Sequence, residues 1–184
     1  MGDIVALYAD GGVIGSNPSP IGGSWAYALV DAEGARVRTA ASVLTAADCG
    51  HPVTNNVTEL LALVSGLEAL PATWCGTVYS DSWVSLQRLF LAARLHGVPL
   101  WLMRRLHAIQ RSGRLARMAY VLLDGHPTRV QLAAGVGKRG SPVSEHNVWC
   151  DTACQQQARA YMEAHRGMQS SGLPGAGVEA RPVS

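Results

Sequence analysis

The order of its apolar segments limits what this chain can fold into more than any other feature. Three strand-like segments precede the first helical one, and they lie at residues 4–9, 24–30 and 35–44. The connections between them, residues 10–23 and 31–34, are rich in Gly, Pro, Asn and Asp. Such connections join neighbouring antiparallel strands. The first quarter of the chain is therefore predicted to form an antiparallel meander.

Helical and strand-like segments alternate in the rest of the chain. Leucines at helical spacing predict a helix over 54–70, which Thr54 or Asn55 can cap. The further segments expected are a strand at 77–80, helices at 83–95 and 100–110, a strand at 119–123 and a helix at 147–164. Residues 128–146 fit a strand or a short helix, and we favour a helix followed by the glycine-rich loop 135–140. The predicted class is α/β, a five-stranded mixed sheet with helices on both faces.

The length of 184 residues suits one domain, which we expect at 1–166, with a mobile tail rich in Ser, Gly and Pro at 167–184. No apolar segment approaches the ~18 to 20 residues of a membrane span, and Asp3 stands where a signal peptide carries basic residues. The four cysteines include no CxxC pair and are too few for a disulfide scaffold. We therefore expect a cytoplasmic protein that does not enter a membrane.

Charge is distributed unevenly along the chain. The net charge is only +2, which favours neither a polycation nor an acidic disordered protein. Residues 82–123, however, hold seven arginines and no Asp or Glu, whereas the other residues hold eight basic and thirteen acidic side chains. This asymmetry is typical of a protein that holds a polyanion on one surface and gathers carboxylates elsewhere. Helices with solvated arginine faces would explain it equally well.

Four carboxylates occupy positions from which they can meet. Asp10 and Asp81 each follow an apolar segment, and sites form where neighbouring strands of a mixed sheet end. Glu59 shares a helix face with two asparagines, and Asp151 lies in the first turn of the last helix. Each also has an ordinary explanation, as a turn former, a solvated helix residue or an acid favoured by the helix dipole.

Carboxylates gathered at one place repel each other unless cations lie between them. Oxygen ligands with few imidazoles favour Mg²⁺ or Mn²⁺ over zinc. Two-metal phosphoryl transfer uses such a site, with ions about 4 Å apart that activate water and stabilise the leaving oxygen. If the four carboxylates meet, this is the chemistry that they predict.

Five motifs, taken together and in order, resemble the type 1 ribonuclease H family. They are Tyr8-Ala9-Asp10-Gly11-Gly12, residues 17–26, residues 54–63 with the pattern TNNxxELLAL, Tyr79-Ser80-Asp81-Ser82, and Asn147-Val148-Trp149-Cys150-Asp151. Each is weak alone, but TNNxxELLAL between DGG and YSDS is specific, and the match covers about residues 4–164. The resemblance implies a ribonuclease H-like fold.

The same resemblance implies an activity and its ligands. Asp10, Glu59, Asp81 and Asp151 are then the catalytic residues and hold two Mg²⁺ ions, for which Mn²⁺ can substitute. The reaction is endonucleolytic cleavage of the RNA strand of an RNA–DNA hybrid, which leaves 3′-hydroxyl and 5′-phosphate ends. We expect a monomer whose partner is the hybrid.

Three asparagines fall where the family places amides that meet the hybrid: Asn17, Asn55 and Asn56. An amide suits this role because it can both donate a hydrogen bond to a 2′-hydroxyl and accept one from it. A helix cap for Asn55 or Asn56 and a turn position for Asn17 are the ordinary alternatives.

The chain departs from the family pattern in three places. Trp83 stands where the family commonly has a glutamine in the minor groove, so stacking replaces that contact or the contact is lost. The family's loop histidine has no unambiguous match; His126 fits best, with a surface turn residue as the alternative. The usual lysine-rich extension is reduced to residues 96–99, and the arginines of 101–117, Arg104 and Arg105 among them, can form a backbone-binding face instead.

The sequence is compatible with two competing interpretations. The same fold can act on another nucleic acid, as resolvases and exonucleases do, or the chain can be a hybrid-binding module without catalysis. The asparagine pair beside Glu59 argues against the first, and the four intact acids argue against the second.

Overall fold

One five-stranded sheet organises the part of the chain that the computed structural model describes, residues 3–170. Its strands are β1 (Ile4–Val13), β2 (Gly22–Asp31), β3 (Arg36–Thr45), β4 (Thr77–Ser80) and β5 (Ala119–Leu122). Their order is β3-β2-β1-β4-β5; β1 to β3 are antiparallel, and β4 and β5 run parallel to β1. The predicted meander with its parallel extension is confirmed.

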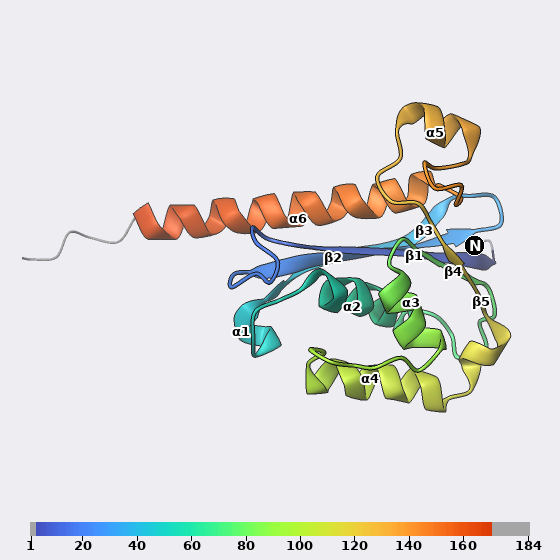
Figure 1. Ribbon diagram of the computed structural model, residues 1–184, viewed down its shortest axis with the longest axis horizontal. Coiled ribbons are helices and arrows are strands. Elements are labelled where there is room, and N and C mark those ends of the chain that lie inside the picture. The colour runs from blue at the N-terminus through green and yellow to red at the C-terminus, as the bar shows by residue number, and fades with distance from the viewer. Residues whose placement is uncertain (1–2, 171–184) are drawn as a thin grey trace, which may run out of the picture.

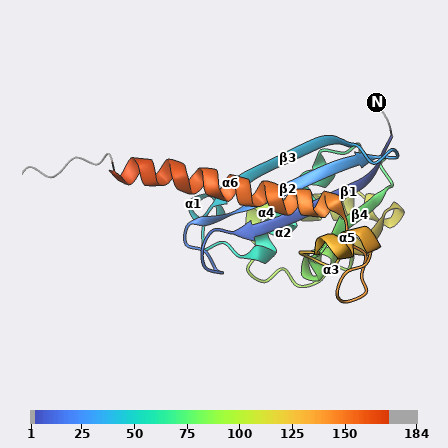
Figure 2. The same ribbon diagram turned by 90° about the horizontal axis from the view of Figure 1, so that it is seen from above.

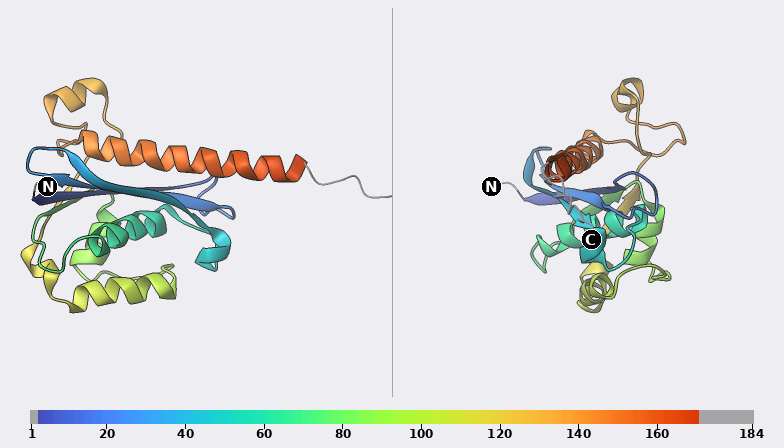
Figure 3. Two further views of the ribbon diagram at one scale, coloured as in Figure 1. Left: turned by 180° about the vertical axis from the view of Figure 1, so that it is seen from behind. Right: turned by 90° about the vertical axis from the view of Figure 1, so that its left-hand side faces the viewer.

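Helices cover both faces of this sheet. They are α1 (Ala46–Cys49), α2 (Asn55–Glu68), α3 (Trp83–Phe90), α4 (Leu100–Arg111), the 3₁₀ helix η1 (Arg114–Arg117), α5 (Arg129–Ala134) and α6 (Glu145–Ser170). The helix α6 lies on one face, whereas α2 and α3 lie on the other, with α4 packed beneath them (Figure 1 and Figure 3). Seen from above, α6 lies along β1 and β2 (Figure 2). None of the helices described here is long and apolar enough to cross a membrane.

Two groups of buried side chains hold these layers together. The larger one lies between the sheet and α2 to α4, where Leu7 and Leu29 of the sheet pack with the fully buried Leu60 and Leu63 of α2. The smaller one lies under α6 and consists of Ala26, Ala28, Cys150, Ala153 and Cys154. Small side chains let α6 approach the sheet closely, which brings the first turns of α6 next to β1.

The first strand is longer than predicted. Residues 4–9 were expected to end at a glycine turn, but β1 continues to Val13 because Gly11 and Gly12 pair with Trp25 and Ser24 of β2. Asp10 therefore lies within a strand rather than at its end, opposite Ala26.

The helix α3 is shorter than predicted, ending at Phe90 instead of residue 95. Ala92 has a positive φ of 50°, which breaks the helix. The buried Arg88 side chain then donates to the carbonyls of Arg94 and His96 in the segment that follows. The contacts of one arginine thus replace the last helical turn.

Other boundaries differ by smaller amounts. Residues 46–49 form the short helix α1 within an expected loop, and Thr54 is the N-cap residue of α2 without a side-chain capping bond. The favoured interpretation of residues 128–146, a helix followed by a loop, is confirmed by α5. The helix α6 runs from Glu145 to Ser170, which is longer than the predicted 147–164; most of the predicted tail, 171–184, lies outside the described residues.

Candidate active site

The register of two parallel strands brings Asp10 and Asp81 together. Tyr8 of β1 is the partner of Tyr79 of β4, and their rings stack with centroids 4.5 Å apart. Asp10 and Asp81 each follow these tyrosines by two residues. Because β1 and β4 are parallel, the two acids lie at the same edge of the sheet. Asp10 is buried, with 7% of its surface exposed. The expectation that these two acids meet is supported by the register.

Glu59 approaches the same place from α2, on the other face of the sheet. The helix backbone lies so close to β1 that a Cβ atom on Gly11 would stand 2.5 Å from the Glu59 amide nitrogen, so only glycine fits there. The Glu59 carboxylate accepts a 2.5 Å hydrogen bond from the Ser82 hydroxyl, and Ser85 lies 3.4 Å away. Ser82 is also the N-cap of α3, which fixes its position. The carboxylate is thus held next to the end of β4.

Asp151 and His126 complete the group from the α6 side. The Gln155 amide donates to the Asp151 carboxylate at 3.1 Å, one helical turn away. The Nδ1 atom of His126, in the connection after β5, lies 3.6 Å from Asp151 Oδ2, and its side chain is 78% exposed. Asn147, one turn before Asp151, is buried. The structure therefore places the predicted loop histidine beside a predicted carboxylate.

The electrostatics show that these carboxylates act on one another. Burial raises the pKa of Asp10 well above its usual value, and repulsion by Asp81, Asp151 and Glu59 adds to this, against a hydrogen bond from the Gly11 amide. Burial likewise raises the pKa of Glu59, opposed by the Ser82 hydroxyl. For Asp81, burial again dominates the raised pKa. Repulsion by Asp151 adds to it, whereas hydrogen bonding and the charge of His126 oppose it.

The fit of this group to a metal ion rests on its donor chemistry. Among residues 3–170, no three His, Cys, Asp or Glu side chains are gathered tightly enough to enclose a metal ion as they stand. Mg²⁺, however, is usually bound by one or two carboxylates and keeps several water molecules, so it needs no closed cage of side chains. Four mutually repelling carboxylates, all of them oxygen donors, fit such a cation.

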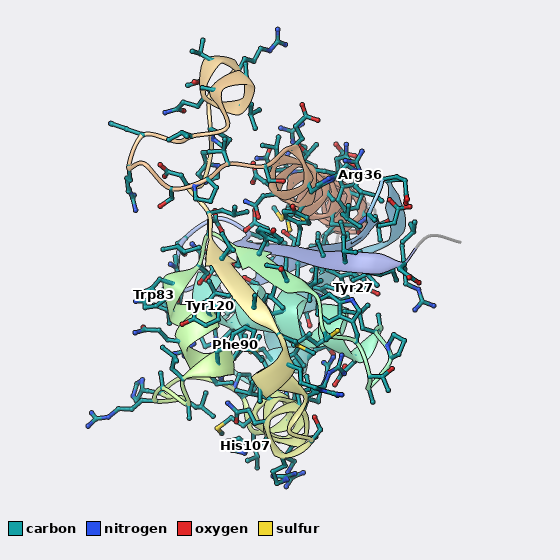
Figure 4. All side chains as sticks on the ribbon, turned by 90° about the vertical axis from the view of Figure 1, so that its right-hand side faces the viewer. Tyr27, Arg36, Trp83, Phe90, His107 and Tyr120 are labelled. Carbon is teal, nitrogen blue, oxygen red and sulfur yellow. The ribbon has the colours of Figure 1, made fainter. Side chains whose placement is uncertain are left out.

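A cavity of about 270 Å³ opens beside Asp81. Its lining comprises Asp81, Trp83, Leu122, Leu123, Asp124, Gly125, His126, Arg139 and Ser141. Trp83 is 43% exposed, and its ring faces Tyr120 of β5, which in turn stacks on Phe90 at 4.7 Å (Figure 4). The acid, the histidine and an aromatic surface thus border one space.

The three predicted substrate asparagines differ in their settings. Asn55 and Asn56 form the first turn of α2, one turn before Glu59. The Asn55 Oδ1 atom is buried without a hydrogen-bond partner in the described part of the chain, and Asn56 is exposed. Asn17 is exposed in the connection between β1 and β2. Asn55 and Asn56 thus lie on the helix that carries Glu59, whereas Asn17 lies in a connection between strands.

The arginines of 82–123 do not form one exposed face. Arg105 forms an ion pair with Glu68 and a hydrogen bond to Ser65, and its guanidinium lies over the Trp101 ring. Arg104, its neighbour, is exposed. The remaining arginines with a structural role are Arg88 and Arg114, which are buried, and Arg117, which donates to the Ala72 carbonyl. Four of the seven arginines are thus engaged within the fold, whereas Arg94, Arg104 and Arg111 are exposed, so the backbone-binding face stays a prediction.

Four residues of this region were not predicted from the sequence. Two of them, Ser82 and Asn147, belong to motifs quoted above. Ser82 directly follows Asp81 and is the N-cap of α3, and Asn147 lies four residues before Asp151. These positions are the signals that could have identified them. Asp124 and Arg139 come together only through the fold, because fifteen residues separate them in sequence.

Comparisons with known proteins establish the fold. No family model and no curated protein matches the sequence. Among solved structures, an RNase H1 isolated from compost by a metagenomic approach is 18% identical with a TM-score of 0.60, covering 88% of this chain and 99% of its own. An N-terminal RNase H domain from Mycobacterium tuberculosis is 19% identical with a TM-score of 0.57 over the same shares. The compost enzyme in complex with RNA/DNA hybrid is 16% identical with a TM-score of 0.56, covering 85% of this chain and 98% of its own. This chain has the ribonuclease H fold, as predicted.

Proposed function

We propose that this protein is a Mg²⁺-dependent endonuclease that hydrolyses the RNA strand of RNA–DNA hybrids. The observation that carries the proposal is the approach of Asp10, Asp81, Glu59 and Asp151 to one another from four separate elements of a ribonuclease H fold, where burial and repulsion between the acids raise the pKa of Asp10, Glu59 and Asp81. A compost RNase H1 of the same fold was solved with an RNA/DNA hybrid, which supports the choice of substrate.

The carboxylates serve to bind divalent ions. When bound, two such ions would activate the attacking water and stabilise the leaving oxygen. Ser82 holds the Glu59 carboxylate in place through its hydroxyl, and Asn147 lies against Asp81. These neighbours fix the orientation of the ligands, as outer partners of metal sites generally do.

His126 is the proposed proton carrier. Histidine is the side chain used most often for proton transfer, and here it lies beside Asp151 with most of its surface exposed. From this position it can take up a proton at the site and exchange it with solvent. Cleavage would leave a 3′-hydroxyl and a 5′-phosphate.

Discrimination of RNA from DNA is assigned to the first turn of α2. Asn55 has a buried, unpartnered side-chain oxygen in the described structure, one turn before Glu59. The exposed Asn56 amide beside it could donate a hydrogen bond to a 2′-hydroxyl and accept one from it, which a deoxyribose cannot offer. Trp83 offers a stacking surface at the cavity beside Asp81, where a base or sugar can pack.

The proposal is tested by incubating the protein with end-labelled RNA–DNA hybrid, duplex RNA and duplex DNA, each with Mg²⁺ and with EDTA. We expect cleavage of the RNA strand of the hybrid, only with Mg²⁺, and little cleavage of either duplex. Equal or faster cleavage of duplex DNA would favour the resolvase- or exonuclease-like alternative. Binding of the hybrid without cleavage under any metal condition would favour the non-catalytic module.

A further inference from the structure

Residues 125–144, between β5 and α6, form a lobe that projects beyond the sheet next to the start of α6 (Figure 1). The lobe contains the short helix α5 and a loop closed by the bridge between Val136 and Pro142. It carries three permanent positive charges, Arg129, Lys138 and Arg139, all exposed, and no Asp or Glu. It is therefore a basic surface attached directly to the acidic site.

A buried carboxylate anchors this lobe through its backbone. Asp124, only 9% exposed, accepts a 2.6 Å hydrogen bond from the Arg139 amide N–H. A Cβ atom on Gly137 would stand 2.3 to 2.6 Å from the Asp124 side chain, so only glycine allows this contact. The backbone, rather than the side chain, thus fixes the position of Arg139. Within residues 3–170, the guanidinium has no ion pair or hydrogen bond of its own.

The free guanidinium borders the catalytic cavity. Arg139 lines the 270 Å³ cavity together with Asp81 and His126, whereas Lys138 and Arg129 do not. The cavity is just below the ~300–1,000 Å³ of pockets that enclose a whole small ligand, which suits one unit of a polymer. Guanidinium stays charged at all working pH values and presents a planar set of donors that matches phosphate.

We infer that Arg139 binds a phosphate of the cleaved strand beside the scissile bond, and that the Asp124–Gly137 contact exists to hold it there. This inference rests on the proposed hybrid nuclease function and adds a positioning residue to it. Because the anchored loop holds the Arg139 backbone beside the cavity that Asp81 also lines, a phosphate contact of its side chain can set the register of the strand.

The test compares Arg139→Gln with Lys138→Gln, a matched loss of one charge from the same loop. Affinity for a fluorescently labelled hybrid is measured in EDTA, where no strand is cut, over a series of salt concentrations. We expect Arg139→Gln to weaken binding about 10-fold and to reduce the slope of log affinity against log salt by about one. Lys138→Gln should stay within about 2-fold of the wild type.

A second variant, Gly137→Ala, keeps every charge but forces the loop away from Asp124, so it should weaken binding like Arg139→Gln. If the wild type cleaves hybrid but Arg139→Gln binds hybrid as tightly as Lys138→Gln does, the inference about Arg139 is overturned and the proposed function stands. A wild type that neither binds nor cleaves hybrid would overturn the proposed function and this inference together.

Discussion

The acidic edge of the sheet and the arginine-rich segment 82–123 are both dense in charge, but the fold treats them in opposite ways. At the sheet edge, the buried Asp10 lies near the half-buried Asp81, and repulsion helps to keep their pKa values raised. In the arginine-rich segment, Arg105 is paired with Glu68 and Arg88 donates to two carbonyls. Charges with partners stabilise a fold, whereas carboxylates buried together raise one another's pKa unless a cation lies between them. Charge that is left uncompensated therefore marks the site better than charge density.

The comparison is tested most strongly by Asp81→Asn, which is nearly isosteric but removes one charge from the edge. We expect hybrid cleavage to fall at least about 1,000-fold, because the amide is a poor ligand for Mg²⁺, while the fold is retained. Steady-state cleavage rates and circular dichroism give the two readouts. Glu33→Gln, an exposed acid of the β2–β3 hairpin, is the control and should keep full activity. Wild-type turnover by Asp81→Asn would remove this residue from the site.

His126→Asn sharpens the comparison by removing the imidazole that lies beside Asp151 at the acidic edge. We expect kcat to fall about 10- to 100-fold with KM nearly unchanged, because proton transfer and not hybrid binding is affected. His107→Asn, an exposed histidine of α4 (Figure 4), serves as the control. If both variants lose activity equally, or neither does, His126 is not the proton carrier.

Substitutions in the arginine-rich segment are expected to have smaller effects, and these effects differ between Arg104 and Arg105. Arg105→Gln breaks the exposed ion pair with Glu68, which is worth about 0.2–1 kcal/mol, so Tm should fall by no more than about 4 °C. Arg104→Gln should leave Tm unchanged and weaken hybrid binding by about 2- to 3-fold. A loss of hybrid affinity that is larger in Arg105→Gln than in Arg104→Gln, at unchanged Tm, would support the binding face that the sequence suggests.

The sequence predicted the architecture because local patterns determine it. Period-two segments joined by turns predicted the meander, and leucine spacing predicted α2, whereas boundaries depended on distant partners. Gly11 and Gly12 read as a turn, but pairing with β2 keeps them in the strand. The end of α3 depends on Arg88 reaching a later segment, which no local pattern reveals.

The candidate site was predictable to the same degree. Order and spacing of the motifs selected the four acids as candidates, and in the structure Asp81, Asp151 and Glu59 all act on the pKa of Asp10. The partners of the arginines were not predictable, because Glu68 meets Arg105 across two helices. The anchoring of Arg139 by Asp124 likewise exists only in three dimensions.

Thermal unfolding in EDTA and in Mg²⁺ tests directly whether the acidic edge is an uncompensated cation site. The pKa of Asp10 is raised in the folded state, so this state holds its proton to higher pH than the unfolded chain. In EDTA, the wild type should therefore lose stability as pH rises from about 4 through that raised pKa. Asp10→Asn has no charge to lose there.

At neutral pH in EDTA, we predict that Asp10→Asn has a higher Tm than the wild type. Excess Mg²⁺ should raise the wild-type Tm by several degrees, because it binds only the folded state, and should leave the variant almost unchanged. A wild-type Tm that Mg²⁺ does not move, together with an Asp10→Asn variant less stable than the wild type in EDTA, would contradict the account.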